Sequence, residues 1–199
     1  MIHITEQQVR EALPMAKAIE LVEECFRRLG EGRAVNHPRR RLVLENSAAL
    51  HYMAAGDHDD RLLAAKLYVT NPRAGAQFLV VLFDAEAATL LATFDANLLG
   101  QIRTGAASGV ATRYLARPEA ATLGILGSGF QAESQLEAIA QVRTLRSVNV
   151  YSPSPENRAS FAQRMSRRLE LPVEAVDTAE QAVRSRDIVV TVTKSREPV

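Results

Sequence analysis

The stretch Gly124-Ile125-Leu126-Gly127-Ser128-Gly129-Phe130-Gln131-Ala132 decides the fold of the later part of this chain. The apolar run that ends at Leu126 is typical of a buried parallel strand. Gly127, Gly129 and Ala132 then fill a G-x-G-x-x-A pattern, in which the first glycine permits a tight turn and the second lets a pyrophosphate approach the backbone. The next residues repeat apolar side chains on one helical face, so free N–H groups at the helix start would point at the phosphates. The stretch therefore predicts a dinucleotide-binding turn, with an ordinary glycine turn as the alternative.

The residues around this turn alternate between strand and helix patterns. Strands are predicted at 121–126, 147–151, 171–175 and 187–192, and helices at 131–142, 155–169 and 178–184, the last capped by Thr178. This alternation is typical of an α/β protein with a doubly wound parallel sheet of the Rossmann type. The segment Arg117-Pro118-Glu119 marks a boundary, so we expect this domain to span residues 118–199.

The end of the second predicted strand indicates which dinucleotide binds. An enzyme that uses NAD usually places an acid there against the ribose hydroxyls. Here the chain has Ser152, Pro153 and Ser154, with Arg158 one helical turn further on. Two hydroxyls and an arginine suit a 2′-phosphate, and this part of the sequence has no acid to repel it. The pattern favours NADP over NAD. The alternative is that Arg158 is a solvated helix residue and that either cofactor fits.

Composition limits the classes of protein. The chain has 199 residues, is 47% hydrophobic and carries a formal charge of +1, so it implies neither a nucleic-acid surface nor a membrane surface. Residues 1–8 lack the apolar core of a signal peptide, and no apolar run approaches the about 18 residues of a membrane span. The single cysteine, Cys25, shares a helical face with Leu21, Val22, Phe26 and Leu29, which predicts a buried structural thiol. No disulfide within the chain is possible, and a cytoplasmic location fits best.

Residues 1–117 have a different pattern. Thr5 and Gln8 predict a capping box for a first short helix, and Pro14 opens a second helix that ends near Gly30. Strand candidates separated by short turns follow at 41–45, 49–54, 62–70, 78–83 and 89–94. Short connections predict a mainly antiparallel meander, and hence an α+β domain. The predicted helix at 96–115 is rich in Gly, Ala and Ser, which allows close packing against another element.

Three groups of cations in this first domain are candidate binding residues. Lys66 lies in the middle of an apolar strand, either on a solvated face or facing a cavity that needs a charge. Arg103, beside Thr104, is suited to a carboxylate or phosphate, or to a surface ion pair. The run Arg39-Arg40-Arg41 would usually be solvated, although strand alternation would direct at least one of the three inward. We expect no metal site, because the acidic segment 57–60 is predicted to form a hairpin turn and has no second set of ligands.

These residues resemble the ornithine cyclodeaminase and mu-crystallin family along essentially the whole chain. The motifs that carry the resemblance are Pro38-Arg39-Arg40-Arg41, Leu50-His51-Tyr52-Met53, Ala65-Lys66-Leu67-Tyr68, Asp95-Ala96-Asn97 with Ile102-Arg103-Thr104-Gly105-Ala106-Ala107-Ser108, and Gly127-Ser128-Gly129-Phe130-Gln131-Ala132. The segment 188–193 is similar to the strand and loop that lie under the nicotinamide in that family.

The resemblance implies roles for particular residues. The Pro-Arg segment, Lys66 and Arg103 would hold the carboxylate of an amino acid or cyclic imino acid, and Met53 would line the substrate site. Within the arginine run, the distance along the chain to Met53 favours Arg40, with Arg39 or Arg41 as alternatives. The resemblance adds Thr104, Thr191 and Val192 to the predicted cofactor residues. Those already indicated by the glycine turn and the second strand are Gly127, Ser128, Gly129, Phe130, Gln131, Ala132, Ser152, Ser154 and Arg158.

The resemblance also implies an activity. Members transfer hydride between a substrate carbon and NAD(P), and the leading expectation is conversion of L-ornithine to L-proline and ammonia. Alternatives are a cyclic ketimine reductase, an alanine dehydrogenase, and a non-catalytic protein that binds NADPH like a mu-crystallin. Lys66 is the candidate catalytic residue, moving a proton if burial lowers its pKa. Members pair through the first domain, so we expect residues 1–117 to serve both substrate binding and dimerisation in a homodimer.

One departure from the family pattern concerns the catalytic aspartate. In the family this residue follows the later strands of the nucleotide domain, whereas the sequence given ends at Val199. The Rossmann domain is therefore expected to be partial, in a fragment or a truncated member. We expect no full cyclodeaminase activity from these residues alone.

Overall fold

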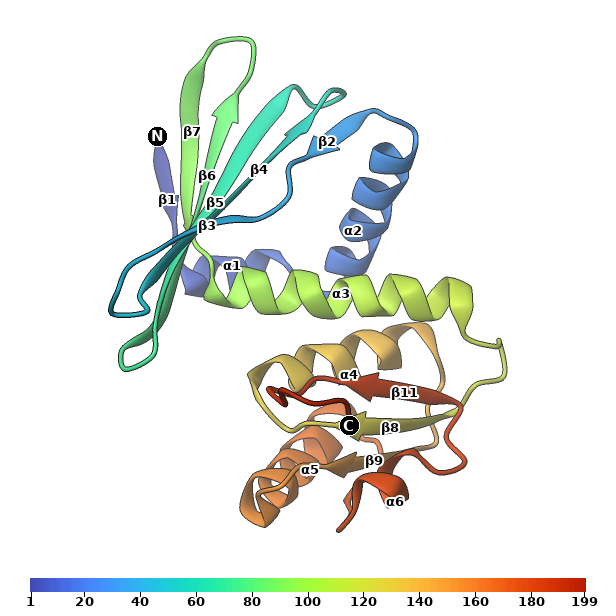
Figure 1. The fold of residues 1–199 in the computed structure, drawn as a ribbon. Coiled ribbons are helices and arrows are strands. Elements are labelled where there is room, and N and C mark those ends of the chain that lie inside the picture. The colour runs from blue at the N-terminus through green and yellow to red at the C-terminus, as the bar shows by residue number, and fades with distance from the viewer. The chain divides into compact units, whose positions relative to one another are not determined.

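The computed structural model describes residues 1–199, which form two compact units (Figure 1). The first unit contains Met1–Pro14 and Glu20–Gly100, and the second contains Met15–Ile19 and Gln101–Val199. The boundary expected from the sequence, after residue 117, lies at the end of a long helix, α3 (Asn97–Leu115). The packing instead assigns most of α3 to the second unit, because that helix fits closely against the next one.

The first unit is built on a 7-stranded sheet. Its elements in chain order are β1 (Ile2–Ile4), α1 (Glu6–Ala12), the larger part of α2 (Met15–Gly30), β2 (Ala34–Asn36), β3 (Arg40–Val43), β4 (Ala49–Asp57), β5 (Leu62–Asn71), β6 (Gly75–Asp84) and β7 (Thr89–Asp95). The strand order is β1-β7-β6-β5-β4-β2, and β3 also pairs with β4.

The predicted meander is confirmed, because β4, β5, β6 and β7 pair in sequence with antiparallel neighbours. Strand β1 is the exception, since it pairs with β7 in parallel. Neither β1 nor β2 was predicted from the sequence. Each is three residues long, too short for an alternating pattern to be recognised.

The predicted helix starts are also confirmed. Thr5 and Gln8 form both hydrogen bonds of a capping box at α1, and Pro14 is the N-cap of α2. The start of α3 has a cap from far along the chain: the Glu6 carboxylate accepts hydrogen bonds from the backbone N–H groups of Asn97 and Leu98, at 2.8 and 2.9 Å. A carboxylate at a helix N-terminus is stabilised by the helix dipole as well as by these bonds.

The second unit contains a parallel sheet of four strands. Its elements after α3 are β8 (Thr122–Leu126), α4 (Phe130–Val142), β9 (Ser147–Tyr151), α5 (Pro155–Leu169), β10 (Val173–Ala175), α6 (Ala179–Val183) and β11 (Ile188–Thr191). The order β10-β9-β8-β11 places the third, second, first and fourth strands of the unit side by side. That order and the parallel pairing confirm the predicted Rossmann-type sheet.

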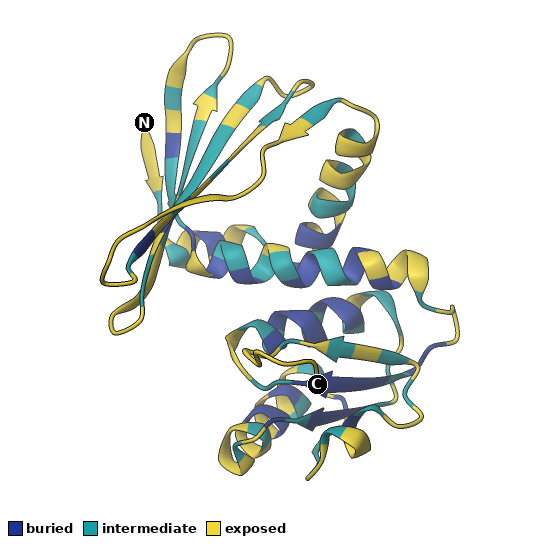
Figure 2. Cartoon of the chain, in the orientation of Figure 1, coloured by how far each residue is buried: buried dark blue, intermediate teal, exposed yellow.

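The hydrophobic core of the second unit lies between this sheet and the helices α4 and α5 (Figure 2). The fully buried side chains at its centre include Leu123, Val148, Val150 and Phe161, from β8, β9 and α5. Each such side chain contributes about 1.5–3 kcal/mol when it leaves water. The sheet of the first unit is mostly half-buried or exposed by comparison (Figure 2).

The small residues of α3 allow the close packing that the sequence predicted. A Cβ atom at Gly105 would lie 2.3 Å from the backbone oxygen of Ser134 in α4. At Gly109 a Cβ would lie 3.2 Å from the Cβ of Ala138. Only glycine lets the two helices approach this closely, so the small side chains determine where α3 packs.

The prediction for Cys25 is wrong, because this thiol is exposed. The buried residues of α2 lie in its first turns, at Met15, Ala18 and Ile19. The later turns of α2 are attached to the sheet by ion pairs. Arg28 lies 2.9 Å from Asp57, the last residue of β4, and 2.6 Å from Asp60 in the turn that follows. The ion pairs hold this end of α2 while the apolar stripe around Cys25 stays accessible.

None of the helices combines the length and the apolar character that crossing a bilayer requires.

Candidate functional site

The glycine turn between β8 and α4 has the backbone geometry that the motif predicted. Gly127 adopts a φ of +116°, and a Cβ atom there would lie 2.4 Å from the Val192 carbonyl oxygen. Its N–H donates to the Tyr151 carbonyl at 2.7 Å. Any side chain at this position would be strained and would collide with backbone, so glycine is required.

The start of α4 can accept an anionic group. Gly129 is the N-cap and supplies no side-chain hydrogen bond to the first N–H groups of the helix. A Cβ atom at Gly129 would meet nothing within 4 Å, so the space beside the N-cap residue is open. The Gln131 side-chain oxygen is buried without a hydrogen-bond partner and is an acceptor still to be satisfied. Uncapped N–H groups, the helix dipole and open space together fit a pyrophosphate.

Two other predicted cofactor segments lie beside this turn. Val192, directly after β11, donates from its N–H to the Leu126 carbonyl at 2.9 Å, which places Thr191 and Val192 against the glycine turn. The stretch of α3 that contains Thr104 runs beside the start of α4, because Gln101 donates to the Phe130 carbonyl. The structure therefore gathers these predicted residues at the carboxyl edge of the sheet, where ligands of such folds bind.

The end of β9 joins the same edge. The hydroxyl oxygens of Ser128 and Ser152 are 2.7 Å apart, and Ser152 is buried. The Ser154 hydroxyl accepts a hydrogen bond from the Asn157 N–H at 3.2 Å and so caps α5. Ser152 is thereby linked to the glycine turn, whereas Ser154 contributes mainly to the start of the helix.

Arg158 is not a solvated helix residue, since its side chain is 12% exposed. Its Nη1 donates to the Ser152 carbonyl at 3.0 Å, and its guanidinium lies 5.8 Å from the centre of the Tyr151 ring. Its Nη2 donates to the Asp177 carboxylate at 2.6 Å. The guanidinium therefore lies over the end of β9, where the sequence placed it.

Asp177 is the residue that the sequence reasoning missed. The sequence has no acid directly after the second strand of this unit, β9, and that was the basis for favouring NADP. Asp177 instead follows the third strand, β10. The carboxyl ends of parallel strands meet at one edge, so strand adjacency brings this acid to Arg158. An Asp immediately before the helix cap Thr178 was the available signal.

A basic and aromatic face occurs on the sheet of the first unit. His51, Tyr68 and Phe78 are partners across β4, β5 and β6, and their rings stack with centre distances of 4.3 and 4.7 Å. The Lys66 ammonium lies 5.3 Å from the Tyr68 ring centre and 5.5 Å from that of Phe78. Lys66 is thus a half-buried cation over aromatic rings, with Met53 as its partner on β4.

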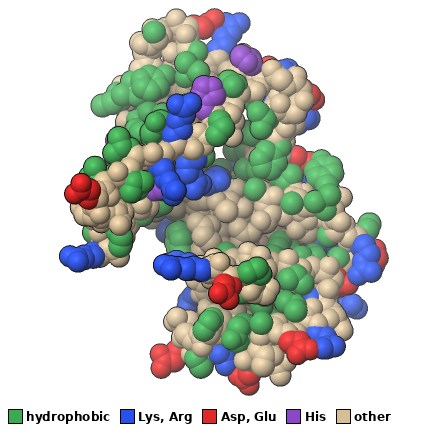
Figure 3. Space-filling model, viewed as in Figure 1, with side chains coloured by type: hydrophobic (Ala, Val, Ile, Leu, Met, Phe, Trp, Pro, Cys, Tyr) green, Lys and Arg blue, Asp and Glu red, His purple; other side chains and the backbone are tan.

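The strand register divides the arginine run between the two faces of the sheet. Arg41 pairs with His51, and the Arg39 guanidinium lies 5.9 Å from the Tyr68 ring centre, so both lie on the face of Lys66. Arg40 pairs with Tyr52 and lies on the opposite face. The carboxylate ligand within the run stays a prediction: Arg40, which the chain distance to Met53 favours, lies on the other face from Lys66, and the alternatives Arg39 and Arg41 lie on the same face as Lys66. The distance along the chain does not show where the pairing of β3 with β4 begins. A shift of one residue in that register moves a side chain to the opposite face of the sheet. Figure 3 shows basic side chains among apolar ones on the first unit.

Arg103 is exposed on α3 and belongs to the second unit, whereas the other candidate carboxylate ligands belong to the first. The acidic segment 57–60 is bound to Arg28 and, through Asp59, to Arg33. No group of three or more His, Cys, Asp or Glu side chains is arranged to hold a metal ion.

The parallel sheet, the glycine turn and the open start of α4 define a Rossmann-type fold, the class to which many dinucleotide-binding proteins belong. The family model for the ornithine cyclodeaminase/mu-crystallin family matches residues 2–199. The chain belongs to this family.

Known members show what the chain is similar to. It is 42% identical over 121 residues to a Delta(1)-pyrroline-2-carboxylate reductase of Bacillus cereus, a match that covers 61% of this chain and 37% of that protein. The solved Delta(1)-pyrroline-2-carboxylate reductase of Thermococcus litoralis, in complex with NADH and L-proline, is 32% identical with a TM-score of 0.94, covering 100% of this chain and 64% of that one. An archaeal alanine dehydrogenase dimer with bound NAD is 31% identical with a TM-score of 0.91, covering 99% and 63%. The chain thus spans less than two thirds of these relatives.

Proposed function

We propose that the protein is an NAD(P)-dependent oxidoreductase that acts on an amino acid or a cyclic imino acid. The observation that carries this proposal is the start of α4, where uncapped N–H groups and the open space at Gly129 suit a pyrophosphate. A nicotinamide cofactor, when bound, would supply or accept hydride at the substrate carbon. Relatives named as reductases and as an alanine dehydrogenase support the same class of reaction.

The basic and aromatic face of the first unit is the proposed source of carboxylate ligands. Arg39, Arg41 and Lys66 bring cations to one face that also carries apolar rings. A carboxylate that leaves water for such surroundings needs charged donors to offset its desolvation. Lys66 is proposed to move a proton to or from the substrate nitrogen, and the role of Arg103 as a carboxylate ligand stays a prediction from the resemblance.

Reduction of a cyclic imine to the cyclic amino acid is the preferred reaction within this class. The B. cereus and T. litoralis relatives are both named Delta(1)-pyrroline-2-carboxylate reductases, which favours this reaction over the ornithine cyclodeamination expected from the motifs. Cyclodeamination is the second candidate. We propose NADP(H) as the preferred cofactor, because the Arg158 guanidinium lies over the end of β9, where a 2′-phosphate would be placed.

The glycine at position 129 offers a sharp test of the nucleotide site. A methyl group at Gly129 would enter open space, so Gly129→Ala should fold normally while it obstructs the pyrophosphate. We expect the dissociation constants of both NADH and NADPH, measured by cofactor fluorescence, to rise by about tenfold or more. Gly30→Ala is the matched control, since its added methyl group also meets nothing within 4 Å.

Unchanged cofactor affinity in Gly129→Ala would contradict the proposed nucleotide site. Turnover is tested separately, by oxidation of NADPH or NADH with five- and six-membered cyclic imino acids and by release of ammonia from L-ornithine. Imine reduction without ammonia release supports the preferred reaction. Cofactor binding without any turnover would favour a non-catalytic NADPH-binding protein.

A further inference from the structure

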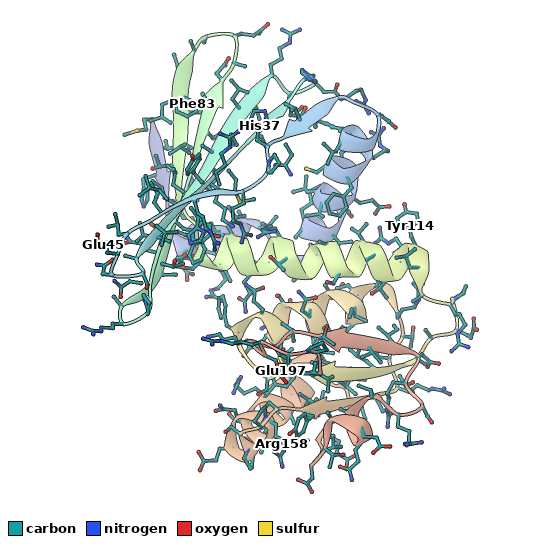
Figure 4. All side chains as sticks on the ribbon, viewed as in Figure 1. His37, Glu45, Phe83, Tyr114, Arg158 and Glu197 are labelled. Carbon is teal, nitrogen blue, oxygen red and sulfur yellow. The ribbon has the colours of Figure 1, made fainter.

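Asp177 lies at the edge of the proposed nucleotide site and has an unusual relation to Arg158. Its side chain is 87% exposed, yet its carboxylate lies 2.6 Å from the guanidinium of an arginine that is 12% exposed. Its position follows from the fold, because Val176 donates from its N–H to the Val150 carbonyl and so fixes the end of β10 beside β9. Figure 4 labels Arg158, the first-turn residue of α5 that this acid reaches.

The two partners are held to different degrees. Arg158 is fixed by its hydrogen bond to the Ser152 carbonyl and by the Tyr151 ring, so its guanidinium would stay in place without Asp177. The carboxylate of Asp177 has Arg158 as its only charged partner among the ion pairs of the chain and is otherwise exposed to water. An ion pair with one exposed partner adds little to stability. The carboxylate can therefore leave the guanidinium at small cost, while the guanidinium remains.

Each partner suits a different form of the cofactor. The 2′-hydroxyl of NAD(H) needs an acceptor, which a carboxylate provides. The 2′-phosphate of NADP(H) needs a cation and is repelled by a nearby carboxylate. Arg158 and Asp177 place both groups at the end of the second strand. Occupation of Nη2 by Asp177 removes one donor that a 2′-phosphate would use.

We propose that Asp177 limits the preference of this protein for NADP(H) over NAD(H). Its carboxylate accepts the ribose 2′-hydroxyl of NAD(H) and competes with the 2′-phosphate of NADP(H) for Arg158. This inference rests on the proposed nucleotide site and adds a specificity-determining residue to it. Arg158 alone would favour NADP(H), and Asp177 reduces that preference.

The test is Asp177→Asn, which removes the charge and keeps the size of the side chain. The backbone N–H of Asp177 bonds to the Gln181 side chain, and this contact does not depend on the carboxylate. We expect the dissociation constant of NADPH to fall by about tenfold and that of NADH to rise severalfold, measured by cofactor fluorescence at fixed salt. Adenosine 2′,5′-bisphosphate and 5′-AMP, as probes without nicotinamide, should show the same opposite changes.

Glu174→Gln is the matched control, because Glu174 is an exposed acid on β10 that makes no ion pair with Arg158. It removes the same charge nearby and should leave the ratio of the two affinities unchanged. A double variant, Asp177→Asn with Arg158→Ala, should lose most of the gain in NADPH affinity. Asp177→Ser provides a second neutral side chain if the amide impairs folding.

The outcomes separate this inference from the proposed function. If the unaltered protein binds both cofactors but Asp177→Asn leaves their ratio unchanged, or shifts it as Glu174→Gln does, the role of Asp177 is wrong and the nucleotide site stands. If the unaltered protein binds neither cofactor, the proposed function and the inference both fail. An opposite shift of the two affinities in Asp177→Asn alone supports the inference.

Discussion

At the residue scale, Asp187 shows how one carboxylate fastens two strands of the second unit. It accepts hydrogen bonds from the N–H groups of Ala121 and Thr122 and from the Thr122 hydroxyl, at 2.8–3.0 Å. Arg117 adds an ion pair at 2.7 Å. These contacts all favour the charged form of the carboxyl group. The backbone hydrogen bond from Ala121 is the largest cause that lowers the pKa of Asp187 from 3.8 to about 2.

The lowered pKa predicts how stability depends on pH. A carboxyl group whose pKa is lower in the folded state contributes stability above its unfolded pKa, and this contribution is lost as the pH falls through the folded pKa. Asp187→Asn should therefore lower the melting temperature at pH 7, with the difference shrinking as the pH falls from about 4 to about 2. Thermal unfolding at several pH values measures this.

The control for this prediction is Glu119→Gln, which removes an exposed partner of Arg117 at 3.7 Å. It should change the melting temperature little, because both side chains are exposed. A melting-temperature difference between Asp187→Asn and the unaltered protein that stays constant down to pH 2 would contradict the prediction.

At the scale of elements, the end of α3 depends on a side chain from beyond α4. Arg143 donates from Nη2 to the carbonyls of Thr112, Arg113 and Ala116, at 2.8–3.1 Å. The last carbonyls of a helix lack partners within it and carry the negative end of its dipole. The Arg143 guanidinium satisfies the Arg113 carbonyl, shares the Thr112 carbonyl with the Ala116 N–H, and bonds to the Ala116 carbonyl just past the helix, so it joins the end of α3 to the end of α4.

Removal of this guanidinium should loosen the end of α3. We expect Arg143→Ala to lower the free energy of unfolding by about 2 kcal/mol, because several charge-assisted hydrogen bonds are lost. Hydrogen exchange should increase at the amides of the last turn of α3 more than in β8 or β9. Arg143→Lys keeps the charge but not the fork of donors, so it should recover only part of the loss. Equal stability of all three proteins would show that water replaces the guanidinium.

At the scale of the whole molecule, the first unit leaves large apolar side chains accessible. Those on the sheet include Leu63 and Val69 of β5, about half exposed, and those on α2 include Phe26. Contiguous exposed apolar surface commonly marks an interface. We therefore expect a homodimer in which the first unit provides the contact.

Light scattering coupled to size exclusion tests this expectation. The chain has a mass of 21.8 kDa, so a particle of twice that mass is the expected result. Leu63→Lys should shift the population toward the monomer, because a charge placed in an apolar interface is left without a partner. Arg61→Ala is the control, because Arg61 lies beside the same strand in an exposed ion pair with Glu86. This substitution should leave the mass of the particle unchanged. A monomeric unaltered protein at high concentration would contradict the homodimer.

Several features of the fold were predictable from short-range patterns. The capping boxes at Thr5 and Thr178 and the glycine turn at Gly127 depend on residues close in the chain, and the structure has each of them. The antiparallel meander followed from short turns between strands. Strands β1 and β2 were not predictable, because each has only three residues and forms a strand through hydrogen bonds to a partner that is distant in the sequence.

The candidate site was predictable in its parts and not in its pairings. The sequence placed Arg158 at the end of the second strand and Lys66 on a sheet face, but it left the three arginines of residues 39–41 open and overlooked Asp177. Both questions concern neighbours across strands. Register and strand order depend on backbone pairing over long sequence separations, which no local pattern records.

The sequence by itself thus determined the glycine turn, because a φ of +116° and the open helix start require glycine and no side-chain cap at those positions. It also determined the alternation of strands and helices, which follows from hydrophobic periodicity. Only the tertiary structure decided that the Asp177 carboxylate binds Arg158 at the carboxyl edge of the parallel sheet. It also decided that Arg40 lies on the opposite sheet face from Lys66. The physical reason is that parallel strands bring their carboxyl ends together whatever separates them in the chain, and that side chains alternate between faces with every residue.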